Sequence, residues 1–516
     1  MVNIRNKGVV IIDFGSQYTK LIARRIRENM VFSEILSPTS DMHTIMKNAP
    51  AAIILSGGPN SVNDNTLFSC NKLIFELNIP ILGICYGLQL MVKNHGGEID
   101  SESSGEYGLA IMNIKDENIL FSGCKNTSKV WMSHGDKAIM VPEKWKLLAV
   151  SSNGVIAAIS NKDNNRFATQ FHPEVSHTEN GKTIIRNFLF KIARCSPRWT
   201  PANFIIEKIQ AIKKIVGDKQ VLVGVSGGVD SSVVAALIKK AVGNKMIAVL
   251  IDHGLMRKDE AKECENFLKE GLDLEINVFD ESDIFFSKLK GLKDPEKKRK
   301  VIGAQFIESF DRVSEKFNDI TFLAQGTLYP DVIESGVSDS KTANVIKSHH
   351  NVGGLPKEMN FQLIEPLRDL FKDEVRNIGF ELGLNDLLIS RHPFPGPGLS
   401  VRIIGEITPQ RVNILQESDK IYIDILHEEN LYNDIWQAFA ILVPIKTVGV
   451  MGDKRTYENL IALRAVTSED GMTADWFKMP NQTLQKVSTK IINNVEGVNR
   501  VVYDITSKPP GTIEWE

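Results

Sequence analysis

The chain has 516 residues, too many for one hydrophobic core, since domains usually span about 100–200 residues. Hydrophobic residues make up 42% and charged residues 24%, values typical of globular proteins, so a disordered or fibrous chain is excluded. The formal net charge of −2 provides no overall field that would attract nucleic acid or an anionic membrane, and we expect neither as a partner.

The cysteines and the apolar segments indicate a compartment. Five cysteines are few, odd in number and widely spaced, without the CxxC pairs typical of zinc or redox sites. Residues 1–8 lead into an apolar strand without a signal-type stretch, and no segment approaches the roughly 18 apolar residues of a membrane helix. The sequence therefore predicts a soluble, cytoplasmic protein.

Short β-branched segments alternate with amphipathic segments up to about residue 400, which is typical of βαβ units. The chain then combines helical segments with predicted strands at Val401–Ile404, near Val443–Val450 and near Arg500–Ile505. The predicted fold class is α/β: two successive doubly wound, mostly parallel-sheet domains followed by a smaller α+β domain. The predicted strands of the first two domains include Val9–Asp13, Ala51–Leu55, Ile81–Ile84, Arg166–Phe171, Val221–Val225 and Ile247–Ile251.

Two proline-rich segments divide this pattern. Cys195–Pro201 contains two prolines and no apolar periodicity, so it is the best linker candidate. His392–Gly398 contains three prolines and two glycines in seven residues, which excludes a continuous helix or a central strand. We therefore predict three domains, at residues 1–196, 197–395 and 396–516.

The segment Pro80–Met91 has the pattern of a buried strand, a sharp turn at Cys85 and a helix. Gly83-Ile-Cys85-Tyr-Gly87 has the G-x-nucleophile-x-G form of an elbow, in which small residues let a strained turn pack closely. A thiol at a helix N-terminus is favoured as the thiolate. Cys85 is therefore a candidate nucleophile, although a buried cysteine in an ordinary β–α turn has the same local pattern.

A histidine and a carboxylate supply the partners that such a cysteine needs. Phe171-His172-Pro173-Glu174 follows a predicted strand, and the proline favours an extended conformation at His172, from which Glu174 reaches the same site. His172 would act as the base for Cys85, and Glu174 would hold the histidine tautomer. Cys85, His172 and Glu174 are therefore the predicted catalytic residues.

A glycine-rich turn, Ser56-Gly-Gly58-Pro59, ends another apolar strand. Backbone N–H groups of Gly58 and Tyr86 are the predicted oxyanion hole. With these motifs, residues 8–195 resemble the class I glutamine amidotransferases, which implies hydrolysis of glutamine through a thioester and release of ammonia. We interpret His134 and His177, near the motifs, as structural or secondary. The matching segments are Asp13–Tyr18, Ser56–Pro59, Gly83–Gln89, Trp131–Gly135 and the His-Pro-Glu motif.

The segment from Gln220 to Leu237 has the pattern of a strand, a glycine-rich loop and a helix. Glycines let backbone N–H groups face an anion, and the helix N-terminus adds a favourable potential for phosphate. The serine-hydrolase pattern G-x-S-x-G also fits Gly224–Gly228, and a tight turn that uses glycine for packing is the structural alternative. The serine-hydrolase pattern leaves Asp230, a candidate Mg²⁺ ligand, unexplained. The predicted ATP-binding residues are Ser226, Gly227, Gly228, Val229, Asp230, Ser231 and Ser232.

The loop Ser226–Ser232 resembles the pyrophosphate-binding loop of the N-type ATP pyrophosphatases. Members of that group adenylate a carbonyl oxygen, release pyrophosphate and let a nucleophile displace AMP. The resemblance therefore implies ATP and Mg²⁺ in this part of the chain, with ammonia from the first domain as the nucleophile.

Further segments resemble the GMP synthetase family, and the resemblance covers nearly the whole chain. They are Gly326–Ser335, Lys347–Pro356, Arg391–Leu399 and Ser507–Glu516. It implies the substrates XMP, ATP and glutamine, and a homodimer that pairs through the last domain.

Three residues are candidates for XMP binding. Arg299, in the basic cluster Lys297–Lys300, is assigned mainly from the family resemblance, and a solvated helix face is the alternative. In the tail, Lys508 can pair with the nucleotide phosphate and Glu514 can accept hydrogen bonds from ribose hydroxyls. A tail docked only for stability by Ile513 and Trp515 remains the structural alternative.

The motifs argue against two other functions. A glutamine-dependent NAD synthetase usually takes its ammonia from a nitrilase-like domain, which the Cys85 and His172 motifs do not fit. A nucleotide-binding regulator with a relic glutaminase would need a damaged triad or phosphate loop, and both motifs are intact.

Overall fold

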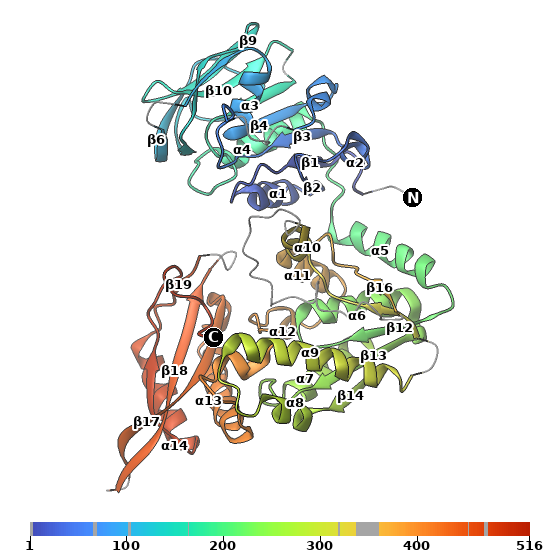
Figure 1. Cartoon of the computed structure of the whole chain (residues 1–516), viewed down its shortest axis with the longest axis vertical. Coiled ribbons are helices and arrows are strands. Elements are labelled where there is room, and N and C mark those ends of the chain that lie inside the picture. Colours follow the sequence, from blue (N-terminus) through green and yellow to red (C-terminus); the bar gives the residue numbers. More distant parts are fainter. Residues whose placement is uncertain are drawn as a thin grey trace. The chain divides into compact units, whose positions relative to one another are not determined.

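The computed structural model describes residues 4–64, 70–101, 105–163, 165–317, 320–336, 361–451, 454–468 and 473–516. Its contacts group the chain into two compact units, Met1–Glu207 and Lys208–Glu516. Each unit contains β-sheets and helices (Figure 1), which confirms the predicted α/β class. Within the described ranges, no helix is long and apolar enough to cross a membrane. The division into three domains stays a prediction.

The first unit is built on a mixed sheet with the strand order β2-β1-β3-β4-β11-β10-β9-β6-β7. The strands from β2 to β11 in this order are parallel, and the remaining pairs are antiparallel. Every residue of β1, β3, β4 and β11 is buried, as expected for strands covered on both faces. The strands are β1 (Val9–Ile12), β2 (Ser33–Leu36), β3 (Ala52–Leu55), β4 (Ile81–Ile84), β6 (Glu106–Ile114), β7 (Thr127–His134), β9 (Trp145–Ser151), β10 (Ile156–Asn161) and β11 (Arg166–Thr169).

Helices and a second, two-stranded sheet complete this unit. Helix α3 follows β4 directly and contacts it most among the helices of the unit, so the start of α3 is fixed at the carboxyl end of a central strand. The helices are α1 (Thr19–Arg27), α2 (Met42–Met46), α3 (Tyr86–Asn94) and α4 (Gly181–Arg186), the small sheet pairs β5 (Glu98–Asp100) with β8 (Lys137–Met140), and α5 (Pro201–Val216) crosses into the second unit.

The second unit begins with a parallel sheet in the order β14-β13-β12-β15-β16. Helix α6 follows β12 after a short loop, so its N-terminus also lies at the carboxyl end of a central strand. The elements are β12 (Gln220–Gly224), α6 (Val229–Val242), β13 (Met246–Asp252), α7 (Glu260–Leu272), β14 (Ile276–Asp280), α8 (Ser282–Leu289), α9 (Pro295–Ser314), β15 (Ile320–Ala324), α10 (Tyr329–Gly336), β16 (Gln362–Ile364), α11 (Lys372–Glu381) and α12 (Asp386–Ile389).

A second sheet follows in the same unit. Two long strands, β17 (Gln437–Met451) and β18 (Lys454–Thr467), pair antiparallel, and β20 (Val498–Tyr503) pairs parallel with β18. Strand β19 (Asp475–Trp476) and helices α13 (Pro409–Glu428) and α14 (Asn481–Asn494) complete it. This mixture agrees with the α+β character that we predicted for residues after about 400.

The hydrophobic core of the second unit runs through both of its sheets. One cluster of buried side chains contains Leu222 and Val249 from the parallel sheet together with Leu442 and Ile461 from β17 and β18. Removing either sheet would therefore expose apolar surface of the other to water, which costs about 25 cal/mol for each Å².

The strand predicted at Val401–Ile404 is wrong. Residues Gly398–Arg402 form a short 3-10 helix, η6, and Ile403 makes only an isolated bridge to Leu442. Gly398 has a φ of 63°, and the Ser400 hydroxyl donates to Pro397 O at 2.8 Å, which closes a helical turn. The apolar residues that suggested a strand, Leu399 and Val401, are buried inside this turn instead.

Candidate active sites

The first candidate site lies where β4 meets α3. Cys85 stands between them with φ 54° and ψ −104°, a conformation that non-glycine residues rarely adopt and that costs about 1–3 kcal/mol. Glycines make room for this turn, because a Cβ atom on Gly83 would come within 2.6 Å of the backbone of Gly87. The backbone therefore forms the elbow that the sequence predicts, with Cys85 at the start of α3.

His172 and Glu174 lie beside the thiol. His172 Nδ1 is 2.7 Å from Glu174 Oε1, and the Cys85 thiol lies close enough to His172 to influence its pKa. Burial lowers the pKa of His172, but the Glu174 carboxylate and the nearby Cys85 thiol outweigh it and raise that pKa well above its usual value. Because the carboxylate accepts from Nδ1, the second ring nitrogen is left for the sulfur. The structure thus brings the three predicted catalytic residues together.

The two residues predicted for the oxyanion hole are neighbours beside Cys85. A Cβ atom on Gly58 would lie 3.4 Å from Tyr86 Cγ and 2.8 Å from Phe14 O, so the turn accepts only glycine there. A Cβ atom on Gly57 would lie 3.1 Å from His172 Cε1, so this turn also borders the histidine. The assignment of Gly58 and Tyr86 stays a prediction.

The other two histidines near the motifs have structural contacts. His134 Nδ1 lies 2.9 Å from Asp136 O and donates to it, and Nε2 lies 3.7 Å from Glu106 Oε2. Burial lowers the pKa of His134. The His177 ring packs on Trp131 with 4.8 Å between centroids. These contacts agree with the interpretation of both histidines as structural or secondary.

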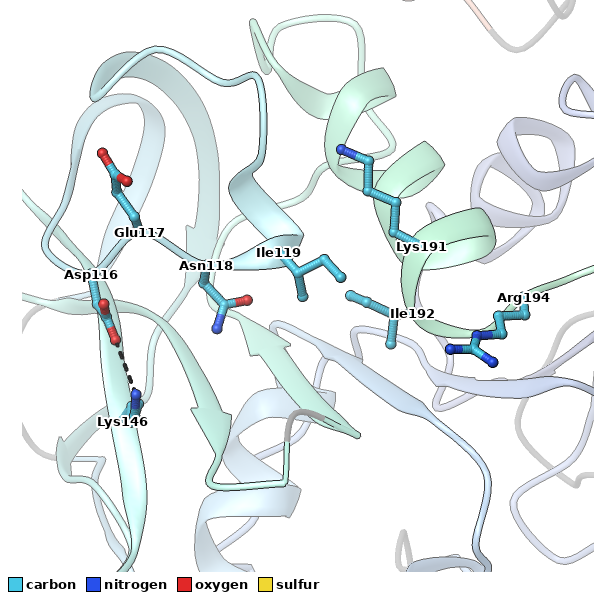
Figure 2. Close-up of a pocket in the computed structure, with 8 residues that line it drawn as sticks. All are labelled: Asp116, Glu117, Asn118, Ile119, Lys146, Lys191, Ile192 and Arg194. Carbon is cyan, nitrogen blue, oxygen red and sulfur yellow. Dashed lines mark ion pairs between the residues drawn. The ribbon is translucent and has the colours of Figure 1, made fainter.

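A pocket of about 480 Å³ opens elsewhere in the first unit. Figure 2 shows acidic and basic side chains around it, with Asp116 paired to Lys146 at 3.7 Å. None of the predicted site residues lines it, so we do not assign it to catalysis. Its lining residues are Asp116, Glu117, Asn118, Ile119, Lys146, Lys191, Ile192 and Arg194.

The second candidate site lies between β12 and α6. Gly227 has a φ of 77°, and Gly228 caps the helix, so the loop turns its backbone toward the N-terminus of α6. The Ser231 and Ser232 hydroxyls both donate to Gly228 O, at 3.0 and 2.9 Å, and Ser226 N donates to Ser231 Oγ at 3.2 Å. Serines therefore hold the shape of the loop. The side chains of Val229 and Ser232 are buried, so only their backbones can face a phosphate.

Asp230 makes an ion pair that the sequence did not indicate. Its Oδ2 lies 2.5 Å from Lys372 Nζ, and its Oδ1 is buried with no hydrogen-bond partner among the described residues. That open carboxylate oxygen fits a divalent cation. Lys372 is the first residue of α11, where a cation is unfavourable because the helix dipole is positive at that end. This unusual placement was the one signal in the sequence for a role of Lys372.

A second cation lies beside the loop. Arg391 Nη1 donates to Gly227 O at 3.2 Å, and its guanidinium pairs with Glu263 at 2.9 Å. The sequence placed Arg391 in a family-like segment but gave it no role. Its contact with Gly227 joins that segment to the loop.

Two of the three predicted XMP residues, Arg299 and Glu514, either contact or belong to the segment 514–516. Arg299 donates to Glu516 O, and the neighbouring Lys298 pairs with the Glu516 carboxylate and donates to Ile403 O at 2.8 Å. Glu514 pairs with Arg402, the last residue of η6.

Lys508, the third predicted XMP residue, contacts a different part of the second unit. Its backbone exchanges two hydrogen bonds with Ala474, at 2.7 and 3.0 Å. The tail is thus docked on the second unit, and the roles of all three residues stay predictions. The family-like segment Lys347–Pro356 lies outside the described residues.

Comparison with family models divides the chain in the same order as the motifs. Residues 10–192 match the model "Glutamine amidotransferase class-I", residues 202–302 match "NAD synthase", and residues 424–515 match "GMP synthase C terminal domain".

Full-length relatives agree with these models. The protein named GMP synthase [glutamine-hydrolyzing] from Chlorobaculum tepidum is 52% identical over 517 residues, covering 99% of each chain. Its namesake from Bacillus licheniformis is 52% identical and covers 100% of each. The one from Thermosipho africanus is 53% identical over 98% of this chain and 99% of that protein.

The fold and the two sites define a glutamine amidotransferase joined to an ATP pyrophosphatase. At this identity over the full length, the particular family is also shown. The chain belongs to the glutamine-hydrolysing GMP synthases, which are enzymes of the ligase class.

Proposed function

We propose that the chain makes GMP from XMP with glutamine as the nitrogen donor, and that two separate sites divide the reaction. Ammonia from glutamine displaces AMP from adenylated XMP, giving GMP, AMP, pyrophosphate and glutamate. One observation carries this proposal: a Cys85 elbow beside a hydrogen-bonded His172–Glu174 pair and a serine-held glycine loop at Ser226–Ser232 occur in one family member.

In the first site, the Cys85 thiolate attacks the side-chain amide carbon of glutamine. The raised pKa of His172 favours an imidazolium, which gives its proton to the departing ammonia as the carbon–nitrogen bond breaks. A thioester remains, and neutral His172 then takes a proton from the attacking water. Backbone N–H groups of Gly58 and Tyr86 stabilise the oxyanion of both steps. Breaking of the carbon–sulfur bond releases glutamate and restores the thiolate.

In the second site, residues Ser226–Ser232 receive the phosphates of ATP. Their backbone N–H groups and the N-terminus of α6 favour the negative charge. Asp230 would hold Mg²⁺, which neutralises phosphate charge when it is bound. Lys372 pairs with the same carboxylate, so it is positioned to meet a phosphate oxygen if Asp230 turns to the cation. Arg299, Lys508 and Glu514 would hold XMP.

We also propose a homodimer formed through β17 and β18. Their far ends expose apolar side chains: Ile445 is 61% exposed, Val448 53%, Val450 72% and Tyr457 55%. Apolar residues gathered on one hairpin mark an interaction surface. Val450→Asp should therefore convert a dimer to a monomer in sedimentation, while Ile206→Asp, at an apolar site on α5 that is 58% exposed, should not. A dimer that persists in Val450→Asp places the contact elsewhere.

Two further assignments belong to this proposal. The three predicted domains, 1–196, 197–395 and 396–516, would separate glutamine hydrolysis, ATP activation and XMP binding with dimerisation. The five cysteines are all free thiols, which fits the reducing cytoplasm.

Product analysis tests the proposed reaction. The protein is incubated with XMP, ATP and Mg²⁺, and with either glutamine or an ammonium salt. We expect GMP, AMP and pyrophosphate from both nitrogen sources, with glutamate only from glutamine. Orthophosphate and ADP in place of pyrophosphate and AMP would contradict adenylation.

A further inference from the structure

A buried arginine holds the carboxylate of Glu514. Arg402 Nη2 donates to Glu514 Oε1 at 2.8 Å and Nε donates to Oε2 at 3.1 Å, so the planar guanidinium grips both oxygens. The arginine is 0% exposed, whereas the Glu514 side chain is 19% exposed. The pair therefore has a fixed inner member and an outer member that a ligand can reach.

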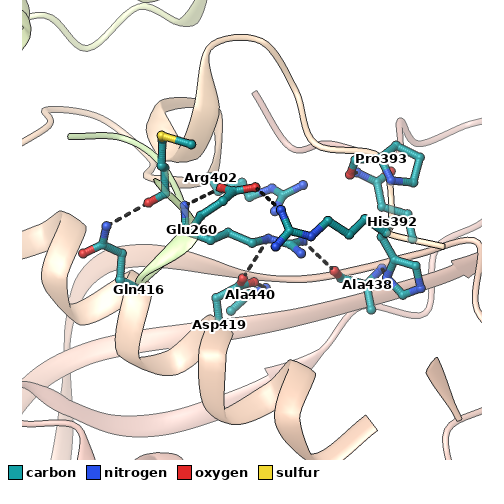
Figure 3. Close-up of polar contacts among 12 residues, drawn as sticks. Glu260, His392, Pro393, Arg402, Gln416, Asp419, Ala438 and Ala440 are labelled. Carbon is teal, nitrogen blue, oxygen red and sulfur yellow. Dashed lines mark hydrogen bonds and ion pairs between the residues drawn. The ribbon is translucent and has the colours of Figure 1, made fainter. Parts of the chain in front are cut away.

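Aromatic rings and a second donor fix this geometry. The guanidinium lies 4.1 Å from the centroid of Phe439 and 5.1 Å from that of Phe394. Gln437 Nε2 also donates to Glu514 Oε1 at 2.8 Å. Figure 3 shows Arg402 within a wider set of polar contacts that includes Asp419 of α13 and Ala438 of β17. Arg402 thus has little freedom to release the carboxylate.

Most acceptor positions of the Glu514 carboxylate are occupied. A carboxylate offers about four lone-pair directions, two on each oxygen. Arg402 and Gln437 occupy both directions of Oε1, and Arg402 occupies one direction of Oε2. Among the described residues no other donor reaches Oε2, so one acceptor direction on it is left, and it suits a hydroxyl donor.

The pair is costly as a purely structural device. Arg402 Nη1 is buried and has no hydrogen-bond partner among the described residues, which carries a desolvation penalty. Buried ion pairs are often replaceable by apolar side chains without loss of stability. A charge with an unsatisfied donor is therefore better explained by a requirement on the position of Glu514 than by stability.

We infer that Arg402 is a positioning residue for the XMP reaction: it orients Glu514 so that one free lone pair of Oε2 accepts a hydrogen bond from a ribose hydroxyl. This inference rests on the proposed contact between Glu514 and XMP. Arg402 itself does not touch the substrate, and it leaves glutamine hydrolysis and ATP binding to other residues.

A double-mutant cycle on the full-length enzyme tests it, with saturating ammonium to bypass the glutaminase. Glu514→Gln and Arg402→Met should each raise the Michaelis constant for XMP by about tenfold, the effect of losing one such contact. In the double variant the Michaelis constant for XMP should also rise about tenfold and not a hundredfold, because both changes remove the same interaction. The Michaelis constant for ATP should change less than twofold in all three.

Arg464 provides the matched control. It is also 0% exposed and holds the tail, but it donates to Thr506 O and Thr512 O rather than to Glu514. The effects of Arg464→Met and Glu514→Gln on the Michaelis constant for XMP should multiply in the double variant. If Arg402→Met does not fold, Arg402→Lys replaces it, since lysine keeps the charge but cannot grip both oxygens.

The outcomes separate the two ideas. An unchanged XMP constant in Glu514→Gln overturns the proposed XMP contact itself. Two outcomes overturn only the positioning role of Arg402. In one, the Michaelis constant for XMP rises tenfold in Glu514→Gln but does not rise in the Arg402 variant. In the other, the effects of the two changes on this constant multiply in the double variant. Equal rises for XMP and ATP would make Arg402 a structural residue.

Discussion

The two candidate sites use the same local architecture for different chemistry. Each lies where a buried central strand turns into a helix, at Cys85 between β4 and α3 and at Gly227–Gly228 between β12 and α6. In the first turn the residue with positive φ is a cysteine, so a side chain stands at the helix N-terminus. In the second it is Gly227, so backbone is left there.

This difference separates covalent catalysis from anion binding. The same helix potential favours a thiolate in one site and a phosphate in the other. In the first site the histidine already has its carboxylate partner, with His172 Nδ1 2.7 Å from Glu174 Oε1. By contrast, Asp230 is paired with Lys372, so the second site has to exchange partners when ATP and a cation arrive.

The largest effect is expected when the first turn loses its side chain. Cys85→Ala should lower glutamine-dependent GMP synthesis to below roughly a thousandth of the wild-type rate, because no other group can form the thioester. Synthesis from ammonium should stay within about twofold, since the thiolate serves only ammonia production. Rates measured with the two nitrogen sources decide it; a folded variant that loses both would refute the division between the sites.

Changing the second turn should give the reciprocal pattern. Asp230→Asn should slow synthesis from either nitrogen source by roughly a hundredfold, about 2.7 kcal/mol, because it weakens the cation's hold on the phosphates. Glutamine hydrolysis, measured without nucleotides, should be unchanged. If only the glutamine-dependent rate fell, Asp230 would belong to ammonia transfer rather than to ATP activation.

These two motifs could be predicted from sequence because each is local. Strands β1, β3, β4, β11, β12 and β13 fall within two residues of their predicted ends, and Pro173 brings His172 and Glu174 to one point. The contacts that the sequence did not give are long-range. Asp230 and Lys372 are 142 residues apart, and Arg402 and Glu514 are 112 apart. Nothing in either short segment specifies its partner.

The strand predicted at Val401–Ile404 failed for a related reason. Alternating apolar residues suit a strand or a buried turn, and Pro397 with Gly398 decides for the turn. The antiparallel half of the first sheet was also not anticipated, because an apolar strand pattern does not state its direction. Such features depend on pairing between distant segments.

A moderate effect is expected in the tail. Lys508→Leu should raise the Michaelis constant for XMP at least tenfold, or about 1.4 kcal/mol for one charge-assisted contact, with little change for ATP. Steady-state kinetics at saturating ammonium measure both constants. Because the backbone of Lys508 is tied to Ala474, the variant keeps the tail docked. Equal changes for XMP and ATP would return the tail to a structural role.

A pH-dependent effect is expected from the histidines of the two units. In the first unit His172 has a carboxylate partner and a raised pKa, although burial lowers the pKa of His134. In the second unit burial lowers the pKa of His253 and of His392 to about 4. His392 Nδ1 accepts from Ala438 N at 3.1 Å, and Nε2 lies 2.9 Å from Tyr432 O and donates to it. A second proton would therefore face the Ala438 N–H, which explains why the neutral ring is favoured.

The sign of the pH dependence follows from these shifts. An unfolded histidine has a pKa near 6.5, so between about pH 4 and 6.5 the unfolded chain binds a proton that folded His392 does not. The contribution is fully present above pH 6.5 and is lost as the pH falls through that window. His172 behaves oppositely: its contribution is present below about pH 6.5 and is lost as the pH rises through its raised value.

Lowering the pH from 7 to 5 should therefore weaken the second unit more than the first, by about 2 kcal/mol for His392 alone. The readout is residual activity after heating, with glutamine hydrolysis reporting the first unit and ammonium-dependent synthesis the second. Synthesis should be lost at a lower temperature than hydrolysis at pH 5, and the gap should narrow in His392→Gln, which has no titrating ring. A gap that does not depend on pH, or one that is unchanged in this variant, would show that His392 does not govern the difference in acid stability between the two units.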